Sequence, residues 1–284
     1  MRINPMVKKD IKVQARSMRI CWEIFAYEAI MAVVFFFAMF LFSQQMTYPA
    51  LAVTQIFILG VVVPVRTASA ISGEKERQTF DIMMTTSMTG FSIIMGKVLT
   101  AMIQSMFYVV AGLPIVALAF VIGGLSWGNL FWFLAVSLLV SFVSASIGIL
   151  CSSICKKTIS AIILSYGIYV LLFIGSFLPY LVTSVVRMSG GVPEKSCWVL
   201  LVNPGMYLLE FFTWSMTGTS VAEELITNYG KTLSVSGAAV HYGWMAVSTL
   251  LFVALAFVFL LIAMRRINPM AGYGRKHAGG KQHG

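Results

Sequence analysis

The chain has 284 residues and a net charge of +10 at neutral pH; 59% of its residues are hydrophobic and only 11% are charged. Its mean hydropathy is +0.88. Such a composition lies far outside that of soluble domains and excludes a soluble globular protein. We therefore expect a membrane protein that crosses the bilayer several times.

Six apolar segments are each long enough to cross about 30 Å of hydrocarbon as a helix. They cover residues 21–42, 50–70, 93–122, 130–151, 159–182 and 242–264. The sequence thus predicts an all-α polytopic membrane protein whose six transmembrane helices form one domain over residues 21–264. The first segment starts too far from the N-terminus, and lacks the small-residue cleavage site, to be a removable signal peptide. We expect the N-terminus to persist.

Basic residues gather on one side of these segments. Seventeen of the 20 lysines and arginines precede the first segment, lie in or beside the second and fourth connections, or follow the last segment. Because lysine and arginine are retained on the cytoplasmic side, we expect both termini and the connection 71–97 in the cytoplasm, and the connection 183–241 outside, in a multi-pass protein of the plasma membrane. The basic excess therefore reflects topology, and no nucleic-acid partner is expected.

The two ends of the chain are basic. In residues 1–20, Asn4-Pro5 is typical of a helix start, and apolar and basic residues then alternate at helical spacing. This pattern predicts an interfacial amphipathic helix in the plane of the inner leaflet, in contact with membrane lipids. The alternative is an unstructured basic flank that only sets orientation. Residues 265–284 are predicted to form a basic cytoplasmic tail.

The connection 71–97 is the longest mixed-charge interruption in the first half of the chain. Gly73 is expected to end the preceding helix, and a charged turn follows it. Phe80, Met83 and Met84 then recur at helical spacing, which puts three adaptable apolar side chains on one face of a short helix. Such a face is suited to docking in a hydrophobic groove. The alternative is a solvated loop whose apolar side chains rest on the lipid interface.

Few polar side chains interrupt the six segments. Glu28 lies well inside the first segment, and Gln104 lies inside the third. Because a polar group exposed to lipid is costly, both are candidates for a transport path. The alternative for Glu28 is neutralisation by a basic residue at a neighbouring helix end, such as Lys97. Glu23, nearer the interface, is expected to pair with Arg19 one turn before it.

The outer connection contains an apolar and aromatic stretch, residues 200–214, in which Asn203-Pro204 is typical of a helix start. The stretch is too short to span the bilayer, which predicts a re-entrant or interfacial helix that enters the membrane from outside. Glu210 is a candidate for lining a water-filled exit there; a simple anchor at the interface is the alternative.

The fourth segment carries small residues along one face. Because small side chains let membrane helices approach closely, this face is predicted to pack against another helix. The residues are Ser137, Ser141, Ser144, Gly148 and Ser152.

No catalytic constellation is recognisable in the sequence. Residues 90–97 imitate a phosphate-binding loop, but five residues separate the two glycines and Val98 follows the lysine, so the cradle and the magnesium-binding hydroxyl are both missing. The three histidines lie outside the segment interiors, and the four cysteines form no metal-ligand pattern. We therefore expect a chain that is not an enzyme, binds no metal and holds no cofactor of its own.

A more specific pattern lies in the connection 71–97, where Glu74-x-Glu76 is followed by a threonine, an apolar run, two threonines and Gly96-Lys97. Together with the six segments, the basic N-terminal helix and the outer Asn-Pro helix, it resembles the type-2 permeases of ATP-binding-cassette (ABC) exporters. Ser87 stands where that family commonly has proline.

The resemblance implies a coupling helix in the connection 71–97, inserted into a groove of a separate ATPase subunit that binds ATP and Mg. The functional unit would then hold two permease chains, identical or paired with a sister chain, and two ATPases. The residues that would couple to the ATPase are Glu74, Glu76, Arg77, Thr79, Phe80, Met83, Met84 and Lys97.

Two other classes of function are weighed against this one. An autonomous secondary carrier or channel would use Glu28 as its coupling group, although the inverted repeats typical of such carriers are not seen. A membrane scaffold or sensor would only recruit a partner through the connection 71–97.

Overall fold

The computed structural model describes residues 18–41, 44–79, 90–123, 127–188, 196–228 and 236–267. All secondary structure in these ranges is helical. Six long helices are apolar enough to cross a membrane, which confirms the all-α, six-span prediction. They are α2 (Met18–Leu41), α3 (Gln44–Glu76), α5 (Gly90–Ile122), α6 (Trp127–Ile154), α7 (Thr158–Met188) and α10 (Gly237–Ile267). Between α7 and α10 lie η1 (Ser196–Val202), α8 (Pro204–Thr217) and α9 (Val221–Asn228).

The helices on either side of the connection 71–97 are longer than their apolar segments. Helix α3 continues to Glu76, and α5 already begins at Gly90. The expectation that Gly73 ends the preceding helix is therefore wrong. Hydropathy marks only the part of a helix that lies in hydrocarbon, whereas glutamate and lysine are good helix formers that extend it into water.

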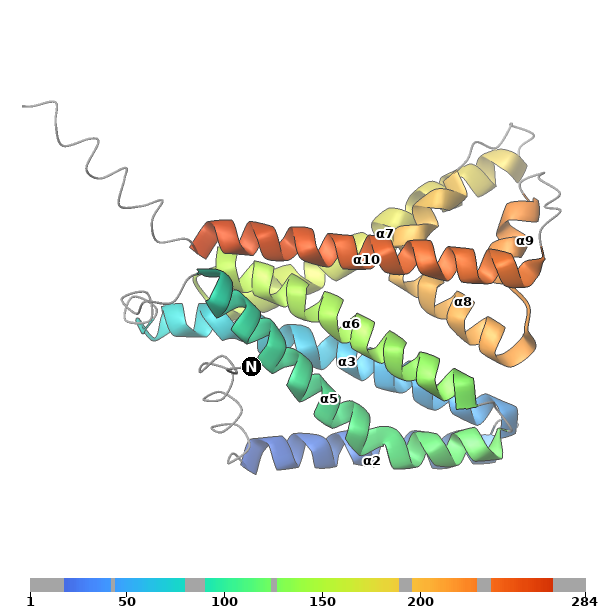
Figure 1. Ribbon diagram of the computed structural model, residues 1–284, viewed down its shortest axis with the longest axis horizontal. Coiled ribbons are helices and arrows are strands. Elements are labelled where there is room, and N and C mark those ends of the chain that lie inside the picture. Colours follow the sequence, from blue (N-terminus) through green and yellow to red (C-terminus); the bar gives the residue numbers. More distant parts are fainter. Residues whose placement is uncertain are drawn as a thin grey trace, which may run out of the picture.

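Helix α3 lies at the centre of the bundle. It packs against α2, α5, α6 and α7. Helix α6 is the most buried of the six spans, and α10 packs on it. Helix α5 runs obliquely across the bundle, from the side of α10 to the side of α2 (Figure 1).

The small-residue face of α6 is buried along its whole length. It packs against α3, which confirms the predicted helix contact and shows that the partner lies in the same chain. The two helices approach closely at Gly148, where an added Cβ would collide with Thr67 Oγ1 and lie 3.0 Å from the carbonyl oxygen of Pro64. A side chain at position 148 would therefore force the two helices apart.

Helix α8 begins as the sequence predicts. The side chain of Asn203 accepts hydrogen bonds from the N–H groups of Gly205 and Met206, at 2.8 and 3.2 Å, and Pro204 occupies the first helical position. Asparagine and proline suit these two positions because they satisfy or remove donors that the helix cannot pair itself. The entry of this helix into the membrane stays a prediction.

The predicted amphipathic helix over residues 1–20 and the basic tail over residues 265–284 fall almost wholly outside the described residues, apart from residues 18–20 and 265–267. Both stay predictions.

Candidate functional site

The predicted coupling residues divide into two groups. Phe80, Met83 and Met84 lie outside the described residues, so their docking face stays a prediction. Glu74, Glu76, Arg77, Thr79 and Lys97 are described, and they lie at the facing ends of α3 and α5.

Helix α3 ends in a defined turn before the undescribed stretch. The N–H of Thr79 donates to the carbonyl of Glu74 at 3.0 Å, and the N–H of Gln78 donates to that of Lys75 at 3.2 Å. Gln78 has φ 56°. This pair of bonds around a left-handed residue is the Schellman motif, which usually places glycine at that position. Because glutamine stands where glycine is usual, this helix end could not be predicted from the position of a glycine.

The end of α3 is fastened to three other helices by a group of side chains: Glu74, Lys75, Glu76, Lys97, Ser152 and Thr158. We call this group the cytoplasmic clamp, after the side of the membrane on which the distribution of lysine and arginine predicts it. Its first contact is the ion pair between Glu74 Oε1 and Lys97 Nζ, 2.9 Å apart. This pair joins α3 to the first turns of α5. Both side chains are largely buried, with 27% and 11% of their surface exposed, so solvent screens the pair less than a surface ion pair.

The other contacts of the clamp fasten α3 to α6 and α7. Lys75 Nζ donates to the carbonyl oxygens of Ser152, Ser153 and Cys155, at 3.3, 2.6 and 3.3 Å. These carbonyls end α6, where they have no partner within the helix and where a positive charge is favourable. Glu76 Oε2 accepts a hydrogen bond of 2.6 Å from Thr158, the first residue of α7.

Ser152 also binds α3 through its side chain. Its Oγ accepts hydrogen bonds from the N–H groups of Ile71 and Ser72, at 2.9 and 2.8 Å. The four helices α3, α5, α6 and α7 are thus tied together beside the connection 71–97. Glu74 and Glu76, which the resemblance assigns to contacts with an ATPase, both have partners within the chain. Arg77 and Thr79 are exposed.

A second polar group, the intramembrane cluster, consists of Glu23, Arg66, Gln104 and Tyr108. The guanidinium of Arg66 forms an ion pair with Glu23 and donates to Gln104 Oε1 at 3.2 Å and to the Tyr108 hydroxyl at 3.0 Å. Tyr108 in turn donates to Glu23 Oε2 at 2.9 Å. The cluster joins α2, α3 and α5.

Of the four residues in this cluster, only Gln104 was predicted from the sequence as a candidate for a transport path. The structure pairs Glu23 with Arg66 of α3. The side chain of Arg19, the expected partner one turn away on the same helix, lies outside the described part of the chain, so that pairing stays a prediction. Arg66 lies ten residues before the end of α3. The sequence did contain an indication of this pairing, because an arginine inside an apolar segment needs a partner of opposite charge.

Glu28 lies one residue beyond Tyr27, which packs edge-on against Tyr108 of the cluster. Glu28 Oε1 is buried and accepts no hydrogen bond from the residues that the structure describes. The alternative in which Lys97 neutralises Glu28 is wrong, since Lys97 pairs with Glu74. The Tyr27 hydroxyl and both polar atoms of Gln55 are likewise buried without a partner in the described part of the chain. Unpaired buried groups of this kind are costly, so water entering between α2, α3 and α5 would stabilise them.

Glu210 is fully buried and fully paired. Its Oε1 accepts hydrogen bonds from Ser220 Oγ at 2.7 Å and from His241 Nδ1 at 2.8 Å, and its Oε2 accepts one from the N–H of Ala222 at 2.9 Å. The ring of His241 stacks on Trp214 with the centroids 4.4 Å apart. Glu210 therefore joins α8 to the start of α9 and to α10, and in this structure its carboxylate has no surface open to water.

Burial raises the pKa of Glu210, but the hydrogen bonds from His241, Ser220 and the Ala222 N–H lower it by more, so the pKa lies below its ordinary value. The carboxylate is ionised at neutral pH and stabilises this junction.

Among the residues that the structure describes, no three histidine, cysteine or acidic side chains lie close enough to hold a metal ion.

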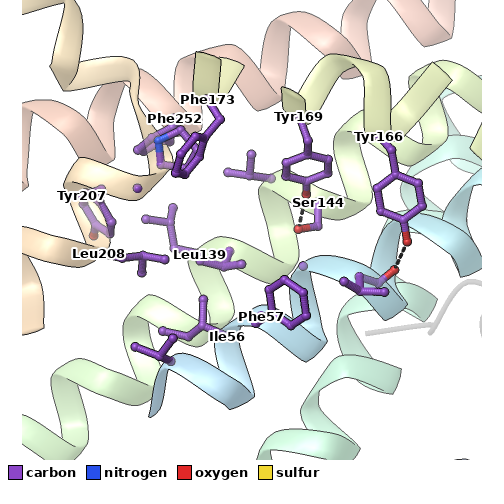
Figure 2. Close-up of a pocket in the computed structure, with 17 residues that line it drawn as sticks. Ile56, Phe57, Leu139, Ser144, Tyr166, Tyr169, Phe173, Tyr207, Leu208 and Phe252 are labelled. Carbon is purple, nitrogen blue, oxygen red and sulfur yellow. Dashed lines mark hydrogen bonds between the residues drawn. The ribbon is translucent and has the colours of Figure 1, made fainter. Parts of the chain in front are cut away.

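An apolar cavity of about 380 Å³ lies deeper in the bundle. Its walls come from α3, α6, α7, α8 and α10, and Figure 2 shows Phe57, Leu139, Tyr169 and Phe252 around this space. Sequence reasoning did not find it, because apolar side chains at these positions are equally typical of a packed core.

The six spans define a polytopic helical membrane protein. A family model described as "ABC-2 family transporter protein" matches residues 29–258. The chain therefore belongs to the ABC-2 transporter family, and it is a membrane component of an ABC-type transport system. No curated protein matches the chain.

Proposed function

We propose that this chain is the permease subunit of an ABC exporter, driven by a separate ATPase subunit that docks on the connection 71–97. Family membership supports the ABC assignment, and the cytoplasmic clamp carries the proposal. A segment that transmits movement must be rigidly attached to the helices that it moves. The clamp joins the end of α3, beside this connection, to α5, α6 and α7. Because the chain lacks a phosphate-binding loop, the energy has to come from a partner that binds ATP and Mg.

The apolar face of Phe80, Met83 and Met84 would fill the groove of the ATPase, and the exposed Arg77 and Thr79 would meet its rim. The clamp would then transmit closure of the ATPases to the spans. In the plasma membrane, with both termini in the cytoplasm, the same movement would release substrate on the outer side.

A second permease chain would complete the unit. Helices α2 and α7 are the least buried of the six spans, and they carry many exposed apolar side chains. These surfaces face lipid or a second chain.

The test is co-purification of the tagged chain with its ATP-hydrolysing subunit after gentle extraction. Phe80→Asp should release the ATPase, because the groove cannot accept a charge, while leaving the amount of inserted permease unchanged. Phe80→Leu should retain the ATPase. Thr219→Asp, which adds the same charge at an exposed position beyond α8, should retain it as well. Full retention by Phe80→Asp would refute the groove assignment, and absence of any ATPase from the wild-type preparation would refute the exporter.

The unpaired Oε1 of Glu28 favours one other function, that of an autonomous carrier with Glu28 as its coupling group. The exporter predicts that liposomes holding the chain alone show no proton flux along a pH gradient, followed with a trapped pH-sensitive dye. A flux that Glu28→Gln abolishes would instead establish the carrier.

A further inference from the structure

The apolar cavity lies at mid-depth in the spans. Gly60, Val140, Tyr169 and Phe252 all line it, and each of them is near the middle of its own span. This depth corresponds to the hydrocarbon interior of a bilayer, where water is absent.

The cavity walls offer hydrocarbon and aromatic surface, and the tyrosine hydroxyls there already have partners. Tyr166 donates to the carbonyl of Val61 at 2.8 Å, and Tyr169 donates to Ser144 Oγ (Figure 2). The Tyr207 hydroxyl lies 3.0 Å from Thr249 Oγ1. A ligand in this cavity is therefore held by dispersion and by exclusion from polar surroundings, and not by hydrogen bonds.

The size of the cavity argues that something fills it. Its volume of about 380 Å³ falls within the range of about 300–1,000 Å³ that is typical of ligand pockets. Apolar cavities do not retain water, and an engineered cavity of roughly 150 Å³ already binds benzene. An empty space of this size would leave its aromatic walls without contacts on one side.

One wall of the cavity reaches the outer surface of the bundle. Phe57 of α3 is 70% exposed and Phe173 of α7 is 50% exposed, and both line the cavity. In a membrane-spanning bundle this surface borders the bilayer, so a flexible hydrocarbon chain can enter sideways between α3 and α7.

We propose that the cavity binds one acyl chain of a membrane phospholipid, with the headgroup outside the cavity. Depth, apolar walls, volume and the lateral opening all match a flexible hydrocarbon chain. The proposal does not depend on the ATPase or on the direction of transport.

The probe is a phosphatidylcholine that carries a diazirine at the end of one acyl chain, added to the purified chain in a sterol-based detergent. After illumination, labelled peptides are mapped by mass spectrometry. Labelling at Tyr169 and Tyr207 should saturate with probe concentration and fall when unlabelled phosphatidylcholine is added. Labelling at Phe36 and Phe37, which are exposed on α2, should rise without saturating.

Gly60 provides the matched variants. A Cβ added at Gly60, like one at Gly167 on α7, meets no atom within 4 Å, and only Gly60 lines the cavity. Gly60→Leu should fill the space and lose most of the saturable labelling, whereas Gly167→Leu should keep it. Thermal unfolding checks that both variants are folded.

Three results would overturn the proposal. The first is labelling of Tyr169 and Tyr207 in the wild-type protein that does not saturate with probe concentration. This result does not depend on any variant. Another is unchanged labelling in folded Gly60→Leu. The third is competition by free oleic acid but not by phosphatidylcholine, which would assign the cavity to a single-chain fatty acid.

Discussion

Three glutamate side chains have partners on other helices. Glu23 pairs with Arg66, Glu74 pairs with Lys97, and Glu210 pairs with His241. Removing one partner of a buried pair leaves the other charge without compensation, which costs more than the pair itself contributes. This penalty is largest for Glu210, which is fully buried, and smaller for Glu23, whose side chain is 47% exposed. A substitution at Glu210 is therefore expected to have a large effect on stability.

Glu210→Gln is predicted to lower the free energy of unfolding by about 3 kcal/mol at neutral pH, because the charge that holds His241, Ser220 and the Ala222 N–H is lost. Thermal unfolding in detergent measures the loss. Lys156→Gln, which removes a charge at an exposed position in the turn between α6 and α7, is the control and should change stability by less than about 0.5 kcal/mol. Equal effects of the two variants would contradict the pairing.

The same carboxylate predicts a pH dependence. Its pKa is lowered on folding, so its contribution to stability is complete above its ordinary pKa of 4.5 and is lost as the pH falls through the folded value. The difference in unfolding temperature between wild type and Glu210→Gln should therefore shrink as the pH falls below 4.5. A difference that persists unchanged into strong acid would show that Glu210 does not titrate as described.

At the scale of the helices, two contacts of α3 set its position: its close approach to α6 at Gly148 and the cytoplasmic clamp at its end. The contact at Gly148 depends on the absence of a side chain, whereas the clamp depends on an ion pair and hydrogen bonds. Each leads to a separate prediction.

Gly148→Ala is predicted to destabilise the protein by about 1–3 kcal/mol, because the added methyl group meets Thr67 and the backbone of Pro64 and overpacks the contact. Gly167→Ala is the matched control, since its methyl group meets no atom within 4 Å. It should be neutral or slightly stabilising, as alanine is the better helix former. The free energy of unfolding, measured for both variants, tests this prediction.

Lys75→Met is predicted to loosen the end of α3, because the carbonyl oxygens that end α6 lose their donor. Hydrogen exchange should then speed up in the amides of residues 71–79. Lys156→Met removes the same charge at an exposed position in the turn between α6 and α7, and should leave this exchange unchanged. If both variants behave alike, the effect belongs to net charge and not to the clamp.

At the scale of the whole molecule, the distribution of lysine and arginine predicts which ends of the spans face the cytoplasm. Gln78 follows the end of α3, Thr219 lies between α8 and α9, and both are exposed. The end of α3 and the turn from α8 to α9 lie at opposite ends of the bundle (Figure 1). In a background without native cysteines, Gln78→Cys should react with a membrane-impermeant thiol reagent only from the cytoplasmic side. Thr219→Cys should react only from the outside. Reaction of both from one side would overturn the proposed topology.

Much of this fold could be predicted from the sequence, because a bilayer imposes strict requirements on each membrane-spanning segment. Spans must be long and apolar, backbone groups must be paired within the helix, and charges must lie in water or find partners. These rules act on consecutive residues. The six spans, the start of α8 at Asn203-Pro204 and the packing face of α6 could therefore be predicted from the pattern of residues alone.

The partners of individual side chains could not be predicted in this way, because they depend on how the helices are placed beside one another. Arg66 meets Glu23 and Tyr108 because α2, α3 and α5 pack against one another. Lys75 reaches the end of α6 because α3 extends to Glu76. A cavity is likewise a property of several helices together, as the walls at Gly60, Tyr169 and Phe252 show. Composition and periodicity determined the membrane class and the number of spans, whereas packing decided which polar groups pair and where space is left for a ligand.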